Sequence, residues 1–269
     1  MQEQSKPKRK LSKILFAILA FVFALWSIFI LITQEVLASA ETPPEEYIMD
    51  LLSLAAELLL ALAVIILFFL IESRQYLKVH FGRAAGIVAI IAGLIPCLAN
   101  FPFLTLFSGE LEFNDLSGLP YLIGFCLVIS LFEEFACRGL FLLEIAKRIR
   151  HTKLGVLLSI LLSGALFSLL HLLNLSAGAP LTDTLYQMGL AFVMGSIFAF
   201  IMLLTGSIIW PVLLHTIYNI GGMIEGTEII TGQAWNNEAT IILLSCILVA
   251  LIVDTIIFIK KKTPFCLYF

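Results

Sequence analysis

Two adjacent carboxylates and an arginine lie inside an apolar run of helical length, in residues 131–139. The charged residues are Glu133, Glu134 and Arg138. An ionised side chain inside a bilayer is costly, so such residues persist mainly where they face a protein interior or a water-filled cavity. The segment therefore predicts a functional site within the membrane.

The spacing of these three charges divides them into two sets. Residues four apart on a helix share a face, whereas adjacent residues diverge by about 100°. Glu134 and Arg138 are therefore predicted to form an intrahelical ion pair that supports the helix. Glu133 faces elsewhere and has no such built-in partner, so it is the carboxylate better suited to proton transfer.

Two later apolar segments carry histidines at helical spacing. The first is Phe167-x-x-x-His171, and the second is His215-x-x-x-Asn219. Each segment alone has a structural explanation, since His and Asn often form hydrogen bonds between membrane helices. The other two histidines of the chain lie in basic loops. His171 and His215 both lie inside apolar runs, and this joint placement strengthens the functional interpretation.

A carboxylate, two imidazoles and an amide on three helices can hydrolyse an amide bond in two arrangements. In one, Glu133 and His171 polarise a water that attacks a carbonyl, while His215 and Asn219 donate hydrogen bonds to the oxyanion. In the other, Glu133, His171 and His215 bind a metal ion that activates the water. The ligand types fit zinc or another divalent metal, and the first arrangement needs no cofactor.

Other hydrolase patterns do not occur in the sequence. It contains no His-Glu-x-x-His, no Gly-x-Ser-x-Gly and no Gly-x-Gly-Asp. Serines inside the apolar runs, such as Ser163 and Ser168, are interpreted as helix-packing residues.

Composition indicates a polytopic membrane protein. Of 269 residues, 61% are hydrophobic and 13% charged, which is far from the profile of a soluble domain. The five cysteines show no Cys-x-x-Cys pair, so neither a disulfide framework nor a thiolate metal site is indicated. Nothing in the sequence predicts a nucleic-acid partner.

We expect an all-α fold of about eight transmembrane helices in one membrane domain, residues 1–269. The motif-bearing core lies at about 121–222, the N-terminal helices at 14–107 and the last helix at 240–259. The apolar runs that predict the spans lie at about 14–33, 51–71, 84–107, 121–144, 154–174, 185–204, 207–222 and 240–259. The first is interpreted as a retained signal anchor, because it is too long for a signal-peptide core.

Basic residues alternate with these runs in a consistent way. All Lys and Arg residues except Arg138 fall in the N-terminal tail, in the C-terminal tail or in every second connection, and acidic residues dominate the other connections. The positive-inside rule therefore predicts an even number of spans with both termini in the cytoplasm.

The predicted depths of the polar residues do not match in straight spans. At 1.5 Å per residue, Glu133 lies about 18 Å from the outer end of its span, whereas His215 lies only about 12 Å from the inner end of its own. A re-entrant start of the short helix at Pro211 is predicted to remove this mismatch.

Taken in order, the three motifs resemble those of the CPBP family, the CAAX prenyl proteases and bacteriocin-processing proteins also called Abi. The segments that carry the resemblance are Glu133-Glu134-x-x-x-Arg138, Phe167-x-x-x-His171 and His215-x-x-x-Asn219. The match covers roughly residues 121–222, each motif lies inside its own predicted span, and no motif letter departs from the family pattern.

The resemblance implies that this chain is a multi-pass membrane protein and acts as an intramembrane endopeptidase. Carried over by position, Glu133 and His171 activate water, His215 and Asn219 stabilise the oxyanion, and Glu134 and Arg138 support the site. The family has been described both as metal-dependent and as a glutamate-type protease.

The implied partners are membrane lipid and a peptide or protein substrate at the membrane. The short loops favour a bacterial plasma membrane, where peptide processing or bacteriocin immunity is expected rather than CAAX cleavage. The chain's own ending, Cys266-Leu-Tyr-Phe269, fits the loose Cys-a-a-X pattern and is interpreted as coincidence.

Two other function classes use the same residues. A transporter would place the carboxylates and histidines along a proton or cation path. A non-catalytic scaffold or self-immunity protein would keep the motifs without turnover.

Overall fold

The computed structural model describes residues 46–261, apart from Ser73, Arg150, Ser176, Ala177, Gly226 and Ala234. The first predicted span, at 14–33, and the chain ending at Phe269 lie outside the described residues. The predicted count of eight spans and the cytoplasmic position of both termini therefore remain predictions.

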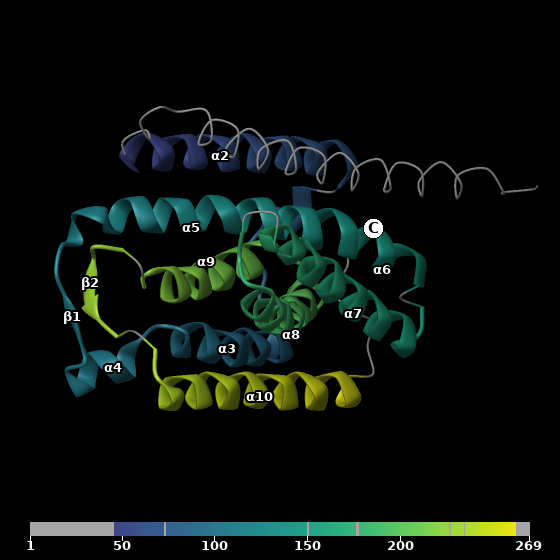
Figure 1. The fold of residues 1–269 in the computed structure, drawn as a ribbon. Helices are drawn as coiled ribbons and strands as arrows, with labels where there is room; N and C mark the ends of the chain where they lie inside the picture. The colour runs from purple at the N-terminus through teal and green to yellow at the C-terminus, as the bar shows by residue number, and fades with distance from the viewer. Residues whose placement is uncertain are drawn as a thin grey trace, which may run out of the picture.

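The described chain is almost entirely helical, as predicted (Figure 1). Its α-helices are α2 (Glu46–Ile71), α3 (Arg83–Ala99), α4 (Phe103–Ser108), α5 (Leu119–Glu134), α6 (Leu143–Ile149), α7 (Lys153–Leu170), α8 (Leu181–Thr205), α9 (Ile209–Met223) and α10 (Asn237–Lys260). Shorter helical segments are η1 (Arg74–Leu77), η2 (Leu116–Gly118), the π-helix η3 (Phe135–Leu142) and η4 (His171–Leu175). The two strands are β1 (Leu111–Phe113) and β2 (Ile230–Gly232).

Within the described part of the chain, five apolar helical stretches are long enough to cross a membrane. They are Leu51–Ile71, Leu116–Ile149, Lys153–Leu175, Leu181–Thr205 and Asn237–Lys260. Each coincides with a predicted span, so the all-α membrane fold expected from the sequence is confirmed.

The predicted run at 84–107 is not one helix. Helix α3 ends at Ala99 and α4 begins at Phe103. Pro102 accounts for the break, because proline disfavours helical backbone at the residue before it. Pro96 lies inside α3 and does not end it.

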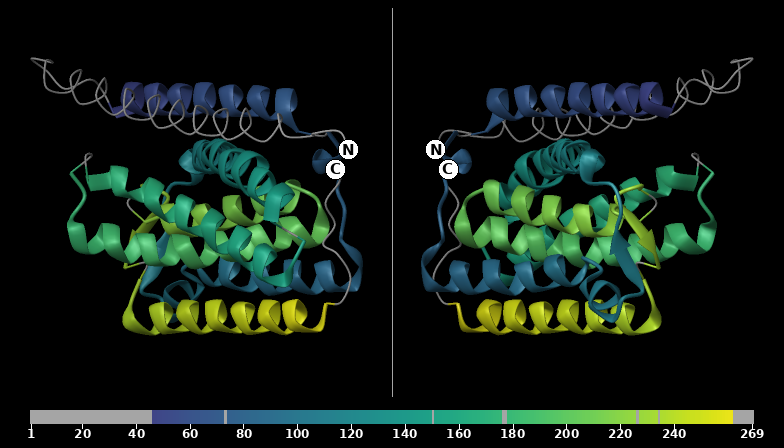
Figure 2. Two further views of the ribbon diagram at one scale, coloured as in Figure 1. Left: turned by 90° about the vertical axis from the view of Figure 1, so that its right-hand side faces the viewer. Right: turned by 90° about the vertical axis from the view of Figure 1, so that its left-hand side faces the viewer.

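Helix α8 forms the centre of the bundle. Every residue from Met194 to Thr205 is buried, which agrees with a helix that is apolar on all sides. Helix α7 packs along α8, and α3 packs against both α9 and α10. The side views show α2 and α10 on opposite sides of the bundle (Figure 2).

The small antiparallel sheet closes one end of the bundle. Strand β1 pairs with β2 in the register Leu111 to Gly232 and Phe113 to Ile230. A second apolar cluster holds the sheet to α5 and to the end of α9 through Leu111, Leu122 and Ile224. The sheet thus fixes the end of α9 relative to the start of α5, the two helices that carry most of the predicted site.

Candidate active site

The helix that carries the paired carboxylates changes its winding directly after them. Helix α5 ends at Glu134 and continues through the π-helical segment η3 into α6. The sequence predicted a regular helix here. Inserted π-turns are rare and frequently mark functional sites, because they widen the helix and redirect its side chains.

Glu134 and Arg138 form the predicted ion pair. Arg138 Nη1 donates to Glu134 Oε1 at 2.8 Å, and both side chains are fully buried. Arg138 Nη2 also donates to the carbonyl of Gly195 on α8 at 3.0 Å, and its guanidinium lies 4.6 Å from the ring centre of Phe167. The pair therefore links α5 to both α7 and α8, as a supporting role requires.

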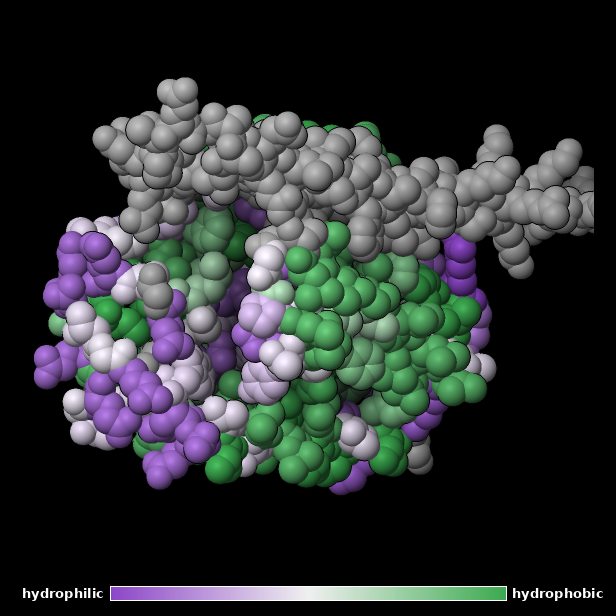
Figure 3. Space-filling model, in the orientation of Figure 1, coloured by the Kyte–Doolittle hydropathy of each residue, from purple (hydrophilic) through white to green (hydrophobic). Residues whose placement is uncertain are grey.

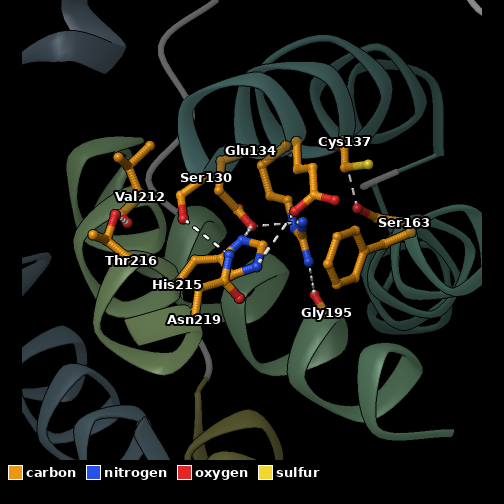
Figure 4. A network of polar contacts seen from close by, with 12 residues as sticks. Ser130, Glu134, Cys137, Ser163, Gly195, Val212, His215, Thr216 and Asn219 are labelled. Atoms are coloured by element: carbon orange, nitrogen blue, oxygen red, sulfur yellow. Dashed lines mark hydrogen bonds and ion pairs between the residues drawn. The ribbon is translucent and has the colours of Figure 1, made fainter. Parts of the chain in front are cut away.

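His215 lies between the two adjacent carboxylates (Figure 4). Its Nδ1 is 2.8 Å from Glu134 Oε1, and its Nε2 is 3.4 Å from Glu133 Oε2. A carboxylate oxygen only accepts, so the Nδ1–H donates to Glu134 and fixes the plane of the ring. Nε2 is thereby directed at Glu133.

His171 is held by its own helix. Its Nδ1 lies 3.1 Å from the carbonyl oxygen of Phe167. Because a carbonyl only accepts, Nδ1 carries the proton, and Nε2 is the acceptor of the neutral ring. The Phe167 ring separates the two imidazoles, at centroid distances of 5.0 Å from His171 and 5.4 Å from His215.

Asn219 lies one turn beyond His215 on α9. Its Nδ2 makes a long 3.5 Å contact with the Ser130 hydroxyl on α5 (Figure 4). Ser130 is fully buried, whereas Asn219 is half-buried. The contact with Ser130 therefore positions the Asn219 amide, and part of the amide remains open to the cavity.

One cavity of about 380 Å³ brings the predicted residues together. Its lining includes Glu133, His171, His215 and Asn219, from α5, the α7–η4 junction and α9. The remaining wall is mainly apolar, with a few uncharged amides. Figure 3 shows a hollow with hydrophilic residues at its floor on this side of the molecule.

The start of α9, the helix that carries His215, is covered by another segment of the chain. The turn between α8 and α9 is buried, with Ser207 and Ile208 both fully covered. The Ile208 N–H donates to the Tyr76 carbonyl and the Trp210 indole N–H donates to the His80 carbonyl, so the segment around η1 covers the turn. Helix α9 therefore begins beneath the η1 segment, and its His215 contacts Glu133 despite the depth mismatch expected for straight spans. Whether the helix is re-entrant in a membrane remains a prediction.

The predicted metal ligands do not form a metal site as they lie. Among the described residues, no group of three or more His, Cys, Asp or Glu side chains is arranged to hold a metal ion. Both nitrogens of His215 face carboxylates, and the Nδ1 of His171 is taken by the Phe167 carbonyl. The hydrogen bonds of both histidines nevertheless use Nδ1 and leave Nε2, so the metal-free and the metal-bound arrangements both remain predictions.

Several residues of the site were not predicted from the sequence. Gly195 accepts the Arg138 bond through its carbonyl, and Ser130 supports Asn219. Glu57 on α2 is buried and near enough to Glu133 for their charges to interact. Only Glu57, an acidic residue inside an apolar run, leaves a signal in the sequence. The serines interpreted as packing residues do bond to backbone: Ser163 to the Cys137 carbonyl and Ser168 to that of Met188.

Comparison with known proteins finds one family that the motif-bearing segment resembles. Residues 115–221 match the family described as type II CAAX prenyl endopeptidase Rce1-like. No curated protein and no solved structure matched the chain. The matched segment runs from η2 to α9 and contains all three motifs. The family match over residues 115–221 thus agrees with the resemblance to the CPBP family that the three motifs carry.

Proposed function

We propose that this protein is an intramembrane endopeptidase that cleaves a membrane-associated protein or peptide. The observation that carries the proposal is the single cavity lined by Glu133, His171, His215 and Asn219. The Rce1-like family match, which is of protease type, supports the same reaction class.

In the proposed reaction, Glu133 is the general base. Its side chain is partly exposed to the cavity, unlike the fully buried Glu134 beside it. Glu133 accepts a proton from water while the water oxygen attacks the peptide carbonyl carbon. His171 orients the same water through Nε2, the nitrogen that its own hydrogen bond leaves as an acceptor.

His215 and Asn219 are the proposed oxyanion donors. They lie one turn apart on α9, and both line the cavity. In its protonated form, His215 donates through Nε2, and Asn219 donates through Nδ2. When the C–N bond breaks, Glu133 returns its proton to the leaving amine, so that protons balance over the cycle. Glu134 and Arg138 hold His215 in place throughout.

The cavity suits a peptide in an extended conformation. Its neutral amides and apolar side chains offer hydrogen bonds to a peptide backbone and contact to uncharged side chains. We propose a bacterial plasma membrane protein whose substrate is a peptide or precursor, with peptide maturation or self-immunity as its biological outcome.

The test compares membrane and secreted peptides from cells that carry the wild type or Glu133→Gln. A precursor should accumulate in Glu133→Gln and in His171→Ala but mature in the wild type. Asp254→Asn is the matched control, because Asp254 is another buried carboxylate, on α10, that does not line the cavity. This variant should process the precursor normally.

The alternative functions give different outcomes in the same cells. Equal maturation in all variants, with biological activity retained, identifies a non-catalytic scaffold or immunity protein. A change in proton or cation flux in Glu133→Gln, without any precursor, identifies a transporter.

A further inference from the structure

The described basic residues gather at one end of the helix bundle. Lys147 bonds to Glu72, which joins the ends of α6 and α2. Lys153 Nζ donates to the Ile259 carbonyl at 2.8 Å, which joins the start of α7 to the end of α10. At these helix ends and in the segment around η1 lie Arg74, Lys78, Arg83, Lys147, Arg148, Lys153, Lys260 and Lys261. We call this end the basic end.

The opposite end carries acidic residues. It contains the β1–β2 sheet, and the Asn236 side chain bonds there to Glu110 while that of Asn114 bonds to the Glu228 carbonyl. The described acidic residues of this end are Glu110, Glu112, Asp115, Asp183, Glu225, Glu228 and Glu238. Figure 3 shows hydrophilic residues gathered around this end. Among the described residues, no Lys or Arg lies here.

The cavity opens toward the acidic end. Along α9, exposure rises from buried His215 through half-buried Asn219 to exposed Met223, and the helix runs away from the covered turn near Tyr76. Along α7, which starts at the basic end, exposure rises from buried Phe167 to half-buried His171. Both helices therefore bury the deep part of the cavity on the basic side.

The rim of the cavity lies at the same end. The Asn174 side chain donates to Gln187 Oε1 at 2.7 Å, and this exposed amide pair joins η4 to the first turns of α8. Asn100, at the end of α3, donates through Nδ2 to the Tyr218 carbonyl at 2.7 Å. On the basic side, by contrast, the fully buried Glu134–Arg138 pair closes the floor.

We propose that the cavity admits its substrate from the membrane face opposite the cytoplasm. The basic end faces the cytoplasm, because Lys and Arg near the ends of membrane helices are retained on that side. The mouth, which opens toward the acidic end, then faces outward. The inference rests on the proposed function for the cleavage itself, and it specifies the substrate class: peptide segments exposed on the outer face.

This orientation excludes one group of substrates. A prenylated C-terminus anchored in the cytoplasmic leaflet lies on the side where the buried ion pair and the η1 segment close the protein. A translocated peptide or the outward part of a membrane protein lies at the open mouth. The chain is thus predicted to act after translocation of its substrate.

Cysteine labelling in intact cells tests the orientation. Gln187→Cys marks the rim, Leu116→Cys marks the acidic end, and Lys78→Cys marks the basic end; all three native residues are exposed. A membrane-impermeant maleimide should label the first two variants in intact cells and Lys78→Cys only after permeabilisation. All variants carry Cys246→Ser and Cys266→Ser, and this background is the blank, because the remaining Cys97, Cys126 and Cys137 are buried.

The opposite pattern overturns the proposal: labelling of Lys78→Cys in intact cells, or protection of both other variants until permeabilisation. Two positions at the acidic end are labelled, so that the test does not depend on one variant that fails to fold. Labelling does not require cleavage. Each cysteine variant is therefore also combined with Glu133→Gln, and its labelling should be the same as without that substitution. A reversed orientation would therefore leave the proposed protease activity standing, whereas unchanged labelling with no Glu133-dependent cleavage would refute only the activity.

Discussion

The Nδ1 atom of His215 lies 2.8 Å from Oε1 of Glu134. The same carboxylate oxygen accepts the hydrogen bond from Arg138, so one buried group connects two motifs that are far apart in the sequence. The pair assigned to a supporting role therefore also positions a residue that faces the cavity. This contact supports the proposed division of roles between the adjacent carboxylates, in which Glu134 holds the site together and Glu133 acts on the substrate.

Replacement of Glu134 should destabilise the protein more than replacement of Glu133. Glu134→Gln removes the charge opposite the fully buried Arg138, and breaking such a pair costs about 3–5 kcal/mol. We expect a lower thermal midpoint in detergent together with loss of cleavage. Glu133→Gln should lose cleavage while keeping a midpoint near that of the wild type. Equal midpoints for the two variants would contradict the division of roles.

Asn219→Ala should slow cleavage without unfolding the protein. Loss of one oxyanion donor typically lowers kcat by about 100- to 1,000-fold. Thr216→Ala is the control on the same helix, since the Thr216 hydroxyl bonds only locally to the Val212 carbonyl. The kinetic constants of the purified protein decide the outcome. A change in KM alone would assign Asn219 to substrate binding instead.

A methyl group at Gly195 should disturb the packing around Arg138. A Cβ there would lie 2.9 Å from Arg138 Nη2 and 3.0 Å from Phe167 Cδ1, so these side chains would have to move. Gly195→Ala should therefore lower both thermal stability and cleavage. Gly189→Ala, on the same helix, would meet nothing within 4 Å and should be neutral or slightly stabilising. Identical behaviour of the two variants would refute the close-packing argument.

Removal of divalent metal should leave cleavage unchanged. Among the described residues, no group of three or more His, Cys, Asp or Glu side chains is arranged to hold a metal ion. Activity of the purified protein is measured before and after treatment with a chelator, with Glu133→Gln as the inactive reference. Loss of activity that zinc restores would favour the arrangement in which Glu133, His171 and His215 bind a metal.

Glu72 should make folding stability depend on pH. Burial raises the pKa of Glu72 from 4.5 to about 7, against the opposing effect of Lys147. A raised carboxyl pKa means that the folded state binds the proton more tightly than the unfolded state, so stability falls as pH rises from about 4.5 to about 7. Glu72→Gln cannot titrate and should remove this part of the dependence.

The measurement for Glu72 is the difference in thermal midpoint between the wild type and Glu72→Gln across that pH range. The wild type should lose stability relative to the variant as pH rises. A constant difference would show that burial does not control this carboxyl group.

The sequence by itself determined the membrane class and the position of most of the described helices, and it supplied the candidate site residues. Apolar runs of about twenty residues predict spans because the bilayer requires that length. Charges inside those runs are conspicuous because they are costly there. Glu133, His171, His215 and Asn219 were therefore visible without a structure, and the spacing of four already paired Glu134 with Arg138.

Only the tertiary structure decided how these residues meet. The contact of His215 with both carboxylates depends on the packing of α9 against α5. The position of Gly195 beneath Arg138 depends on the packing of α8 at the centre of the bundle. Such contacts join residues tens of positions apart, and they arise from packing between helices, whereas sequence periodicity reports only which face of each helix is apolar.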